Sequence, residues 1–144
     1  MSNTLHERDF HAWANEQAAL LRAGHFSSAD IGNIAEEIES MGRGQRSELV
    51  NRLIVLLVHL LKWRWQPGLR GASWRLTVKE QRRALRRHLR DNPSLKPFLD
   101  QAVRDAYDSA QVVAERETGL TAETFPDRCP FTFDQMMDDA FWPE

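Results

Sequence analysis

The chain has 144 residues, of which 42% are hydrophobic and 28% charged, and its formal net charge is −2. This length suits one domain with a single core, and the apolar fraction excludes a disordered chain. Its one cysteine, Cys129, excludes an internal disulfide and fits a reducing compartment. No apolar run approaches the roughly 20 residues that span a bilayer, and the N-terminus lacks the apolar core of a secretory signal. We expect a cytoplasmic protein with no membrane segment, built as a single all-helical domain over residues 1–144, and we identify no cofactor or metal.

The first predicted helix begins at a capping box formed by Thr4 and Glu7 and stops at Gly24. Its apolar stripe comprises Phe10, Trp13, Ala14, Gln17, Leu20 and Leu21. A second helix is expected to open at residues 27–30. Its stripe, spaced three and four residues apart, comprises Ile31, Ile34, Ala35, Ile38 and Met41. Gly42 and Gly44 then predict an end or a bend of this helix.

The third predicted helix covers residues 45–65 and is the most apolar part of the chain. Within residues 53–61 only His59 is polar, so the helix is apolar nearly all round. Such a helix is typical of the buried centre of a bundle. Residues 66–68, with the sequence QPG, predict its end.

The fourth predicted helix has Ser73 as its N-cap and ends at residues 91–93, with the sequence DNP. Its apolar stripe comprises Trp74, Val78, Gln81, Leu85 and Leu89. A fifth helix is expected to start between Pro93 and Pro97 and to end at Gly119.

The last 25 residues predict little regular structure. We expect a short turn at residues 122–125, an irregular stretch at 126–130, and a capping box formed by Thr132 and Gln135. The final aromatic residues, Phe141 and Trp142, should dock back onto the helices. The predicted fold is therefore all-α: a single bundle of about five main helices, with a central buried third helix and an irregular C-terminal strap.

The charges are segregated along the chain. Residues 62–90 carry ten Lys and Arg against one acid, Glu80, whereas both flanking segments are acidic. The fourth helix therefore predicts a basic surface that contacts phosphates without reading base sequence, with Trp63, Trp65 and Trp74 close enough in sequence to stack on bases. The alternative is a solvated basic face partly paired with Asp100, Asp105, Asp108, Glu115 and Glu117. The candidate nucleic-acid-binding residues are Arg75, Lys79, Arg82, Arg83, Arg86, Arg87 and Arg90.

A second candidate site combines the acids near residue 37 with His59. Carboxylates and a histidine on packed helices can hold a divalent metal, which suggests a metal-dependent hydrolase or nuclease that uses Glu37, Glu39, His59 and Lys62. The Glu-x-x-His pairs of di-iron bundles are absent from the sequence, however. The structural alternative pairs Glu37 or Glu39 with Arg52 or His59, pairs Glu48 with Arg52, and makes His59 a hydrogen-bonded core residue.

The sequence contains no P-loop, GxGxxG, GxSxG or HExxH motif. We therefore favour a non-enzymatic interaction or regulatory protein, with a protein partner or self-association, over nucleic-acid binding and over the metal-dependent enzyme. Exposure of Trp13, Phe141 and Trp142 in one patch would support a protein partner.

Eight sequence blocks also resemble a known family. They are residues 9–13 (DFHAW), 33–42 (NIAEEIESMG), 59–63 (HLLKW), 73–74 (SW), 92–95 (NPSL), 125–126 (FP), 129–130 (CP) and 141–143 (FWP). In this order they are similar to the bacterial family called domain of unknown function 29. The resemblance implies a compact all-α protein from a bacterium. It implies no activity, cofactor or catalytic residue, so Glu36, Glu37, Glu39, His59, Lys62, Trp63 and Trp74 are candidates without assigned roles.

Overall fold

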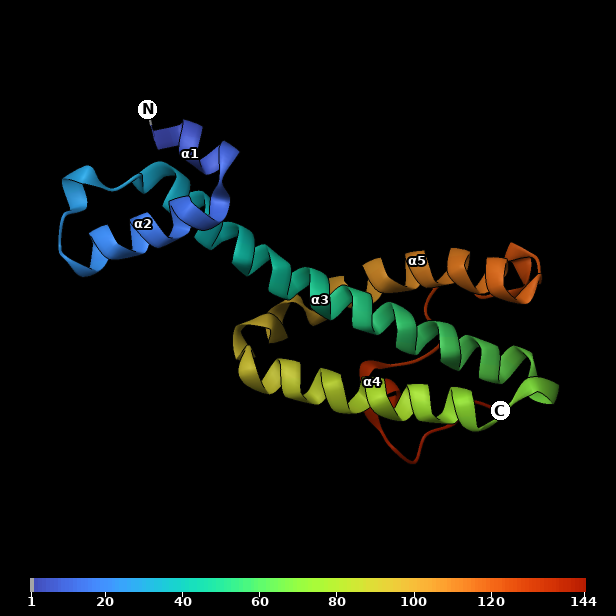
Figure 1. Ribbon diagram of the computed structural model, residues 1–144. Coiled ribbons are helices and arrows are strands. Elements are labelled where there is room, and N and C mark those ends of the chain that lie inside the picture. The colour runs from blue at the N-terminus through green and yellow to red at the C-terminus, as the bar shows by residue number, and fades with distance from the viewer. Residues whose placement is uncertain (1) are drawn as a thin grey trace. The chain divides into compact units, whose positions relative to one another are not determined.

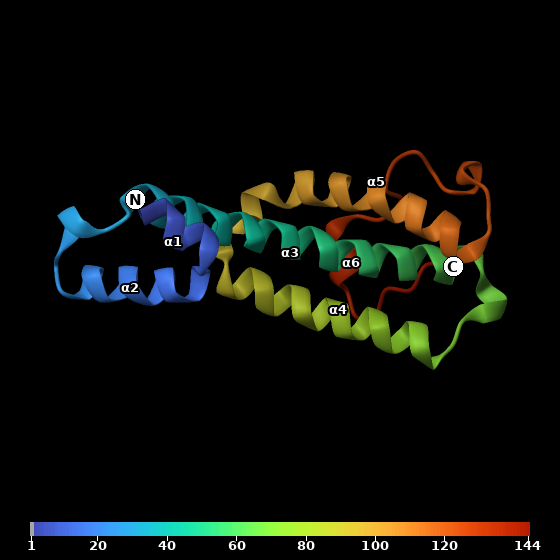
Figure 2. The same cartoon turned by 45° about the horizontal axis from the view of Figure 1, so that its top comes forward.

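The computed structural model describes the backbone of residues 2–144 and the side chains of residues 5–144. In this part of the chain the regular elements are helices and no strand occurs, which confirms the all-α prediction (Figure 1, Figure 2). No described helix has the length and apolar character needed to cross a bilayer. The chain forms two compact units, Met1–Gly44 and Gln45–Glu144.

The first unit contains α1 (Ser2–Arg8), α2 (Phe10–Arg22), a short 3-10 turn (Phe26–Ser28) and the start of α3. The prediction of one helix through residues 4–23 is wrong at Asp9. This residue leaves the helical conformation and its carboxylate accepts a hydrogen bond from the Ala12 amide at 3.1 Å, which makes it the N-cap of α2. Thr4 lies inside α1, so it is not an N-cap, and its side chain is outside the described residues.

The helix α3 (Ile31–Trp65) is continuous over 35 residues. The predicted helix end at Gly42 and Gly44 is therefore wrong. A glycine ends a helix when it adopts a positive φ, and in the described backbone only Gly24 and Gly119 do so. Gly42 and Gly44 are flanked by good helix formers and are not followed by a proline, so the helix tolerates their unfavourable propensity.

The core of the second unit lies between three helices. They are the later part of α3, α4 (Ala72–Asp91) and α5 (Leu99–Thr118), which run side by side in Figure 1 and Figure 2. The α3 residues Leu49, Leu53, Leu56, Leu57, Leu60 and Leu61 have no exposed surface, which confirms the predicted central position of this segment. From α5 the core receives alanines, whose small side chains let the helices approach closely.

The C-terminal segment packs against these helices, as predicted. It contains α6 (Phe133–Met137), whose capping box between Thr132 and Gln135 is present. The ring of Trp142 lies 4.4 Å from that of Trp63, measured between centroids. The Arg70 guanidinium donates to the Pro143 carbonyl at 3.3 Å. We call residues 132–144 the strap.

Arg82 of α4 holds the strap in place. The residue is 1% exposed, and its guanidinium donates to three strap carbonyls: Met136 at 2.6 Å, Gln135 at 3.5 Å and Phe141 at 2.9 Å. The same group lies over the Trp142 ring, 5.3 Å from its centroid. The hydrogen bonds of this buried positive charge therefore go to backbone carbonyls, and its guanidinium also lies over an aromatic face.

Replacing Arg82 with Met should release the strap. The substitution preserves much of the side-chain volume but leaves three strap carbonyls without this donor, and hydrogen bonds from a charged group contribute about 1.5–3 kcal/mol each. We expect the free energy of unfolding to fall by about 3 kcal/mol in urea denaturation. The control is Arg83→Met, at the exposed neighbouring residue. It should change the free energy of unfolding by less than about 0.5 kcal/mol. Equal effects of the two substitutions would contradict the anchoring role.

Replacing Gly44 with Ala should stabilise the protein. A Cβ at this helical position meets no atom within 4 Å, and alanine has a helix propensity about 1 kcal/mol better than glycine. Gly119→Ala is the opposite case, because Gly119 has a φ of 74° that alanine adopts with strain. Thermal unfolding should show a higher midpoint for Gly44→Ala and a lower one for Gly119→Ala. A lower midpoint for Gly44→Ala would mean that residue 44 is not helical.

Candidate functional site

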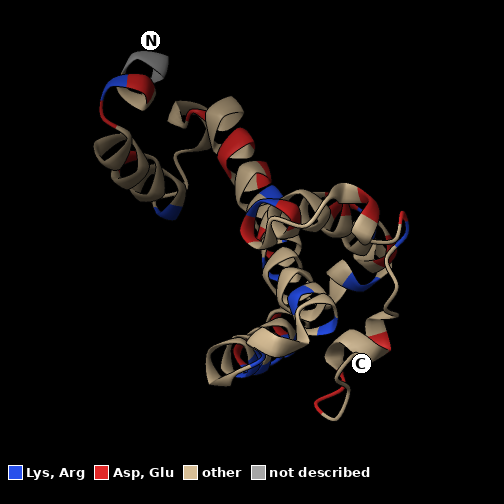
Figure 3. Ribbon diagram, turned by 90° about the vertical axis from the view of Figure 1, so that its right-hand side faces the viewer, with Lys and Arg blue, Asp and Glu red and all other residues tan. Residues whose placement is uncertain are grey.

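Six cations form one exposed surface on α4, which we call the basic face. At about 100° per residue they occupy roughly 120° of the helix circumference, and they extend over about 23 Å of its length. Between residues 75 and 90, Leu76 is the only other residue within this arc. The colours of Figure 3 mark where Lys and Arg lie along the ribbon. The members of the basic face are Arg75, Lys79, Arg83, Arg86, Arg87 and Arg90.

Arg82 does not belong to this surface. The sequence places it among the candidate phosphate contacts, but the strap covers it and its hydrogen bonds go to backbone carbonyls. Burial lowers its pKa, while the nearby carboxylates of Asp139 and Asp138 act in the opposite direction. Since an arginine remains protonated in a protein, Arg82 adds positive potential to the basic face without being reachable itself.

Two adjoining hollows lie along the basic face. The first, of about 410 Å³, is where the strap meets α4, and it is lined by Arg75, Leu76, Lys79, Arg82, Asp139 and Trp142. The second, of about 400 Å³, is lined by Leu76, Lys79, Glu80, Arg83 and Arg87. They share Leu76 and Lys79, so together they form a continuous depression with mainly cationic walls and one indole ring.

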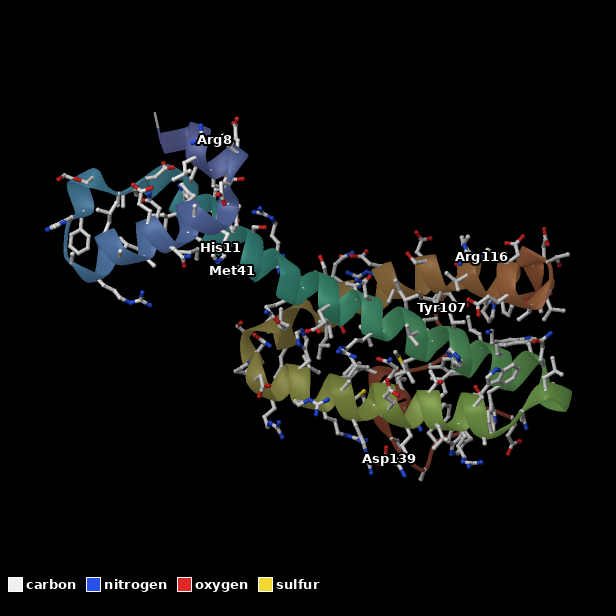
Figure 4. All side chains as sticks on the ribbon, viewed as in Figure 1. Arg8, His11, Met41, Tyr107, Arg116 and Asp139 are labelled. Atoms are coloured by element: carbon white, nitrogen blue, oxygen red, sulfur yellow. The ribbon has the colours of Figure 1, made fainter. Side chains whose placement is uncertain are left out.

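Asp139 of the strap partly neutralises this surface. Its carboxylate accepts a hydrogen bond from Arg86 at 3.0 Å, and Arg86 also donates to the Met137 carbonyl. In Figure 4 the labelled Asp139 lies beside α4. The alternative prediction paired the basic helix with acids of residues 100–117. Among the described residues no ion pair joins α4 to those acids, and Glu117 contacts Lys62 on α3 instead.

The tryptophans near the basic helix are mostly engaged within the protein. Trp65 packs edge-on against Phe125, with ring centroids 5.6 Å apart, and Trp63 packs against Trp142. The Lys62 ammonium lies 5.7 Å from the centroid of Trp74. All are partly buried. Of this group only Trp142 lines a hollow of the basic face, and the sequence analysis did not associate it with that surface.

The acids and the histidine of the second candidate site have separate partners. The Glu37 carboxylate accepts a hydrogen bond from Nε2 of His6 at 2.8 Å in the first unit, and Glu39 is exposed. His59, in the second unit, bonds through Nδ1 to the Val55 carbonyl at 2.8 Å. Within the described residues no group of three His, Cys, Asp or Glu side chains is arranged to hold a metal ion. The predicted Glu48 to Arg52 pair is present at 3.3 Å.

Lys62, the remaining candidate of this site, and Cys129, which the sequence does not single out as a candidate, each have a partner within the second unit. Lys62 lies against Glu117, which lowers the pKa of that carboxyl mainly through the hydrogen bond from the ammonium. Cys129 donates to the Phe131 carbonyl at 3.3 Å, and burial raises the pKa of its thiol. A raised pKa keeps the thiol protonated, which disfavours nucleophilic chemistry at this position.

The signals that sequence analysis missed come from the strap. Asp139 and Trp142 lie 48 and 51 residues beyond the end of α4 at Asp91, and only the docking of the strap brings them to it. Leu76 lies on the predicted polar side of α4 and is 54% exposed. It therefore presents an apolar side chain to solvent among the cations. No spacing pattern within α4 indicates these neighbours.

The fold is all-α and carries a basic helical surface. Comparison with known protein families supports the resemblance that the eight sequence blocks indicate. The model of the family described as Domain of unknown function DUF29 matches residues 5–142, nearly the whole chain. The protein belongs to this family. No curated protein and no solved structure matches the chain.

His59 should titrate below the ordinary histidine range. Burial lowers its pKa below the usual 6.5, assisted by Lys62, while the Val55 carbonyl and Glu117 oppose the shift. The unfolded chain then takes up the proton more readily than the folded protein, so the free energy of unfolding should fall as the pH drops below about 6.5. A pH titration of the imidazole resonances by NMR measures the pH at which His59 is half protonated, and the variant His59→Gln assigns its signal. A midpoint at or above 6.5 would contradict the burial of the ring.

Proposed function

We propose that the protein binds the phosphate backbone of single-stranded nucleic acid through the basic face of α4. The observation that supports this most is the gathering of six exposed cations within about a third of one helix circumference, with a single apolar residue among them. Folding therefore leaves these charges unpaired for the most part, although acids are numerous elsewhere in the chain.

Charge of this density favours a polyanion. An isolated surface cation gains little from a single anionic partner, but a row of cations along a phosphate backbone releases one condensed counterion for each phosphate neutralised. Five of the six side chains are arginines, whose planar guanidinium matches phosphate geometry with two parallel hydrogen bonds. These features suit nucleic acid better than an acidic protein surface, where carboxylates are less regularly spaced.

Trp142 favours a single strand over a duplex. Its partly exposed indole lines the same hollow as Arg75 and Lys79, so an unpaired base can contact the exposed part of the ring while its phosphate contacts a cation. The first sequence-based hypothesis, a protein partner at an aromatic patch, loses its main support because Trp13 is buried and only 3% exposed.

Binding should depend on α4 and on salt. We expect fluorescence anisotropy with a labelled oligothymidylate to show a steep loss of affinity as salt rises, with a slope of about −0.7 for each phosphate contacted. Arg83→Ala/Arg87→Ala should weaken binding at least about ten-fold and reduce the magnitude of the slope by about 1.4. The matched control Arg104→Ala/Arg128→Ala removes two exposed arginines of the second unit that lie outside the basic face.

The substitution Asp139→Asn provides a test that misfolding cannot imitate. It removes the negative charge beside Arg86 while keeping a side chain of similar shape, so affinity for the oligonucleotide should increase by a few-fold. A double-stranded oligonucleotide and a poly-glutamate peptide are the competing ligands. Equal affinity for the peptide, unchanged binding in Arg83→Ala/Arg87→Ala, or weaker binding in Asp139→Asn would overturn the proposal.

A further inference from the structure

The hollow where the strap meets α4 contains one acid among its cations. Asp139 lines this hollow together with Arg75, Lys79 and the indole of Trp142. A carboxylate at this place lowers the positive potential, so it works against the binding of phosphate. The phosphates of a bound strand therefore do not account for the acid. The bases of that strand, in contrast, carry hydrogen-bond donors that a carboxylate can bind.

The Asp139 carboxylate has acceptor capacity to spare. Its Oδ1 accepts a hydrogen bond from Arg86 at 3.0 Å, and no hydrogen bond from another described residue reaches its Oδ2. A carboxylate has about four lone pairs with which it accepts hydrogen bonds. Arg86 thus holds the group in one orientation, while most of its lone pairs stay available to a ligand in the hollow.

The other charged groups that line the hollow are donors. Arg75 and Lys79 lie four residues apart on α4, both are exposed, and neither forms an ion pair within the described part of the chain. Guanidinium and ammonium groups donate hydrogen bonds and accept none. A ligand in the hollow therefore meets an acceptor on the strap and two cationic donors on α4.

Guanine is the base whose edges match this arrangement. Its N1–H and its N2 amino group are adjacent donors for a carboxylate, and its O6 and N7 are the acceptors that an arginine or lysine binds most often. Adenine and cytosine place a ring acceptor beside the amino group, so one carboxylate oxygen would face a lone pair. Thymine has a single N–H between two carbonyls. A carboxylate therefore discriminates against these three bases.

The hollow also has the size and the apolar contacts that a base needs. Its volume of about 410 Å³ falls within the range of about 300–1,000 Å³ that is usual for small-molecule sites. The apolar part of its lining is Leu76, which is 54% exposed, and the part of the Trp142 ring that Trp63 and Arg82 leave uncovered. A few polar groups placed around apolar contacts are typical of a site that orients its ligand.

We propose that Asp139 selects guanine, so that an unpaired guanine of the bound strand occupies this hollow. The inference rests on the proposed function, because the basic face holds the strand that carries the base. Asp139 then has two opposite effects on binding. Its charge weakens the contact with the phosphates of every strand, whereas its hydrogen bonds favour the strands that present a guanine.

Labelled oligothymidylates of one length, each with a single central substitution, test this selection by fluorescence anisotropy. The strand with one guanine should bind about ten-fold more tightly than the unsubstituted strand or those with one adenine or cytosine. Hypoxanthine lacks the N2 amino group but keeps N1–H, O6 and N7, so its strand should bind with intermediate affinity. In Asp139→Asn the preference for guanine should fall below about two-fold, although the affinity for plain oligothymidylate increases.

Asp138→Asn is the matched control. It also removes one negative charge from the strap, but Asp138 does not line the hollow, and the amide oxygen of asparagine can still accept from the Ala140 amide as Oδ1 does at 2.9 Å. The guanine preference should persist in this variant. Equal binding of all the strands, or an undiminished preference in Asp139→Asn, would overturn guanine selection while salt-dependent binding of oligothymidylate upholds the proposed function. Failure of every strand to bind would overturn both.

Discussion

The burial of Arg82 is the interaction on which the arrangement of the second unit depends. Its guanidinium is covered by the strap and donates to strap carbonyls, so α4 and the C-terminus are fixed to each other by a charge that water no longer reaches. Removing a charge from water is costly unless every donor finds an acceptor. Here the acceptors are backbone groups, which any strap sequence offers provided that its conformation is correct.

This anchoring divides α4 into surfaces with different roles. The apolar stripe around Val78 and Leu85 faces the core, Arg82 faces the strap, and the remaining cations face solvent. The docked strap also carries Trp142 and Asp139 to the edge of the basic face, where one adds an aromatic wall and the other a negative charge. A change in the strap would therefore alter the proposed binding surface without altering any residue of α4.

Much of the fold follows from local patterns in the sequence, whereas most of the candidate site does not. The all-apolar segment around His59, the helix end at Gly119 and the capping box at Thr132 are all present because nearby residues determine them. Gly42 misled the prediction because a glycine that caps a helix end adopts a positive φ, which composition alone does not reveal. Arg82 looked like a surface cation because its partners are carbonyls supplied by a distant segment, and a backbone acceptor leaves no signal in the sequence.

The most direct measurement of the central claim is an NMR titration of the protein with an oligothymidylate, following backbone amides together with arginine and tryptophan side-chain N–H signals. The account predicts shifts concentrated on residues 75–90 and on the Trp142 indole, while the Arg82 Nε–H signal stays protected from exchange with water. Shifts centred on α5 or on the first unit, or loss of protection at Arg82 on binding, would contradict it.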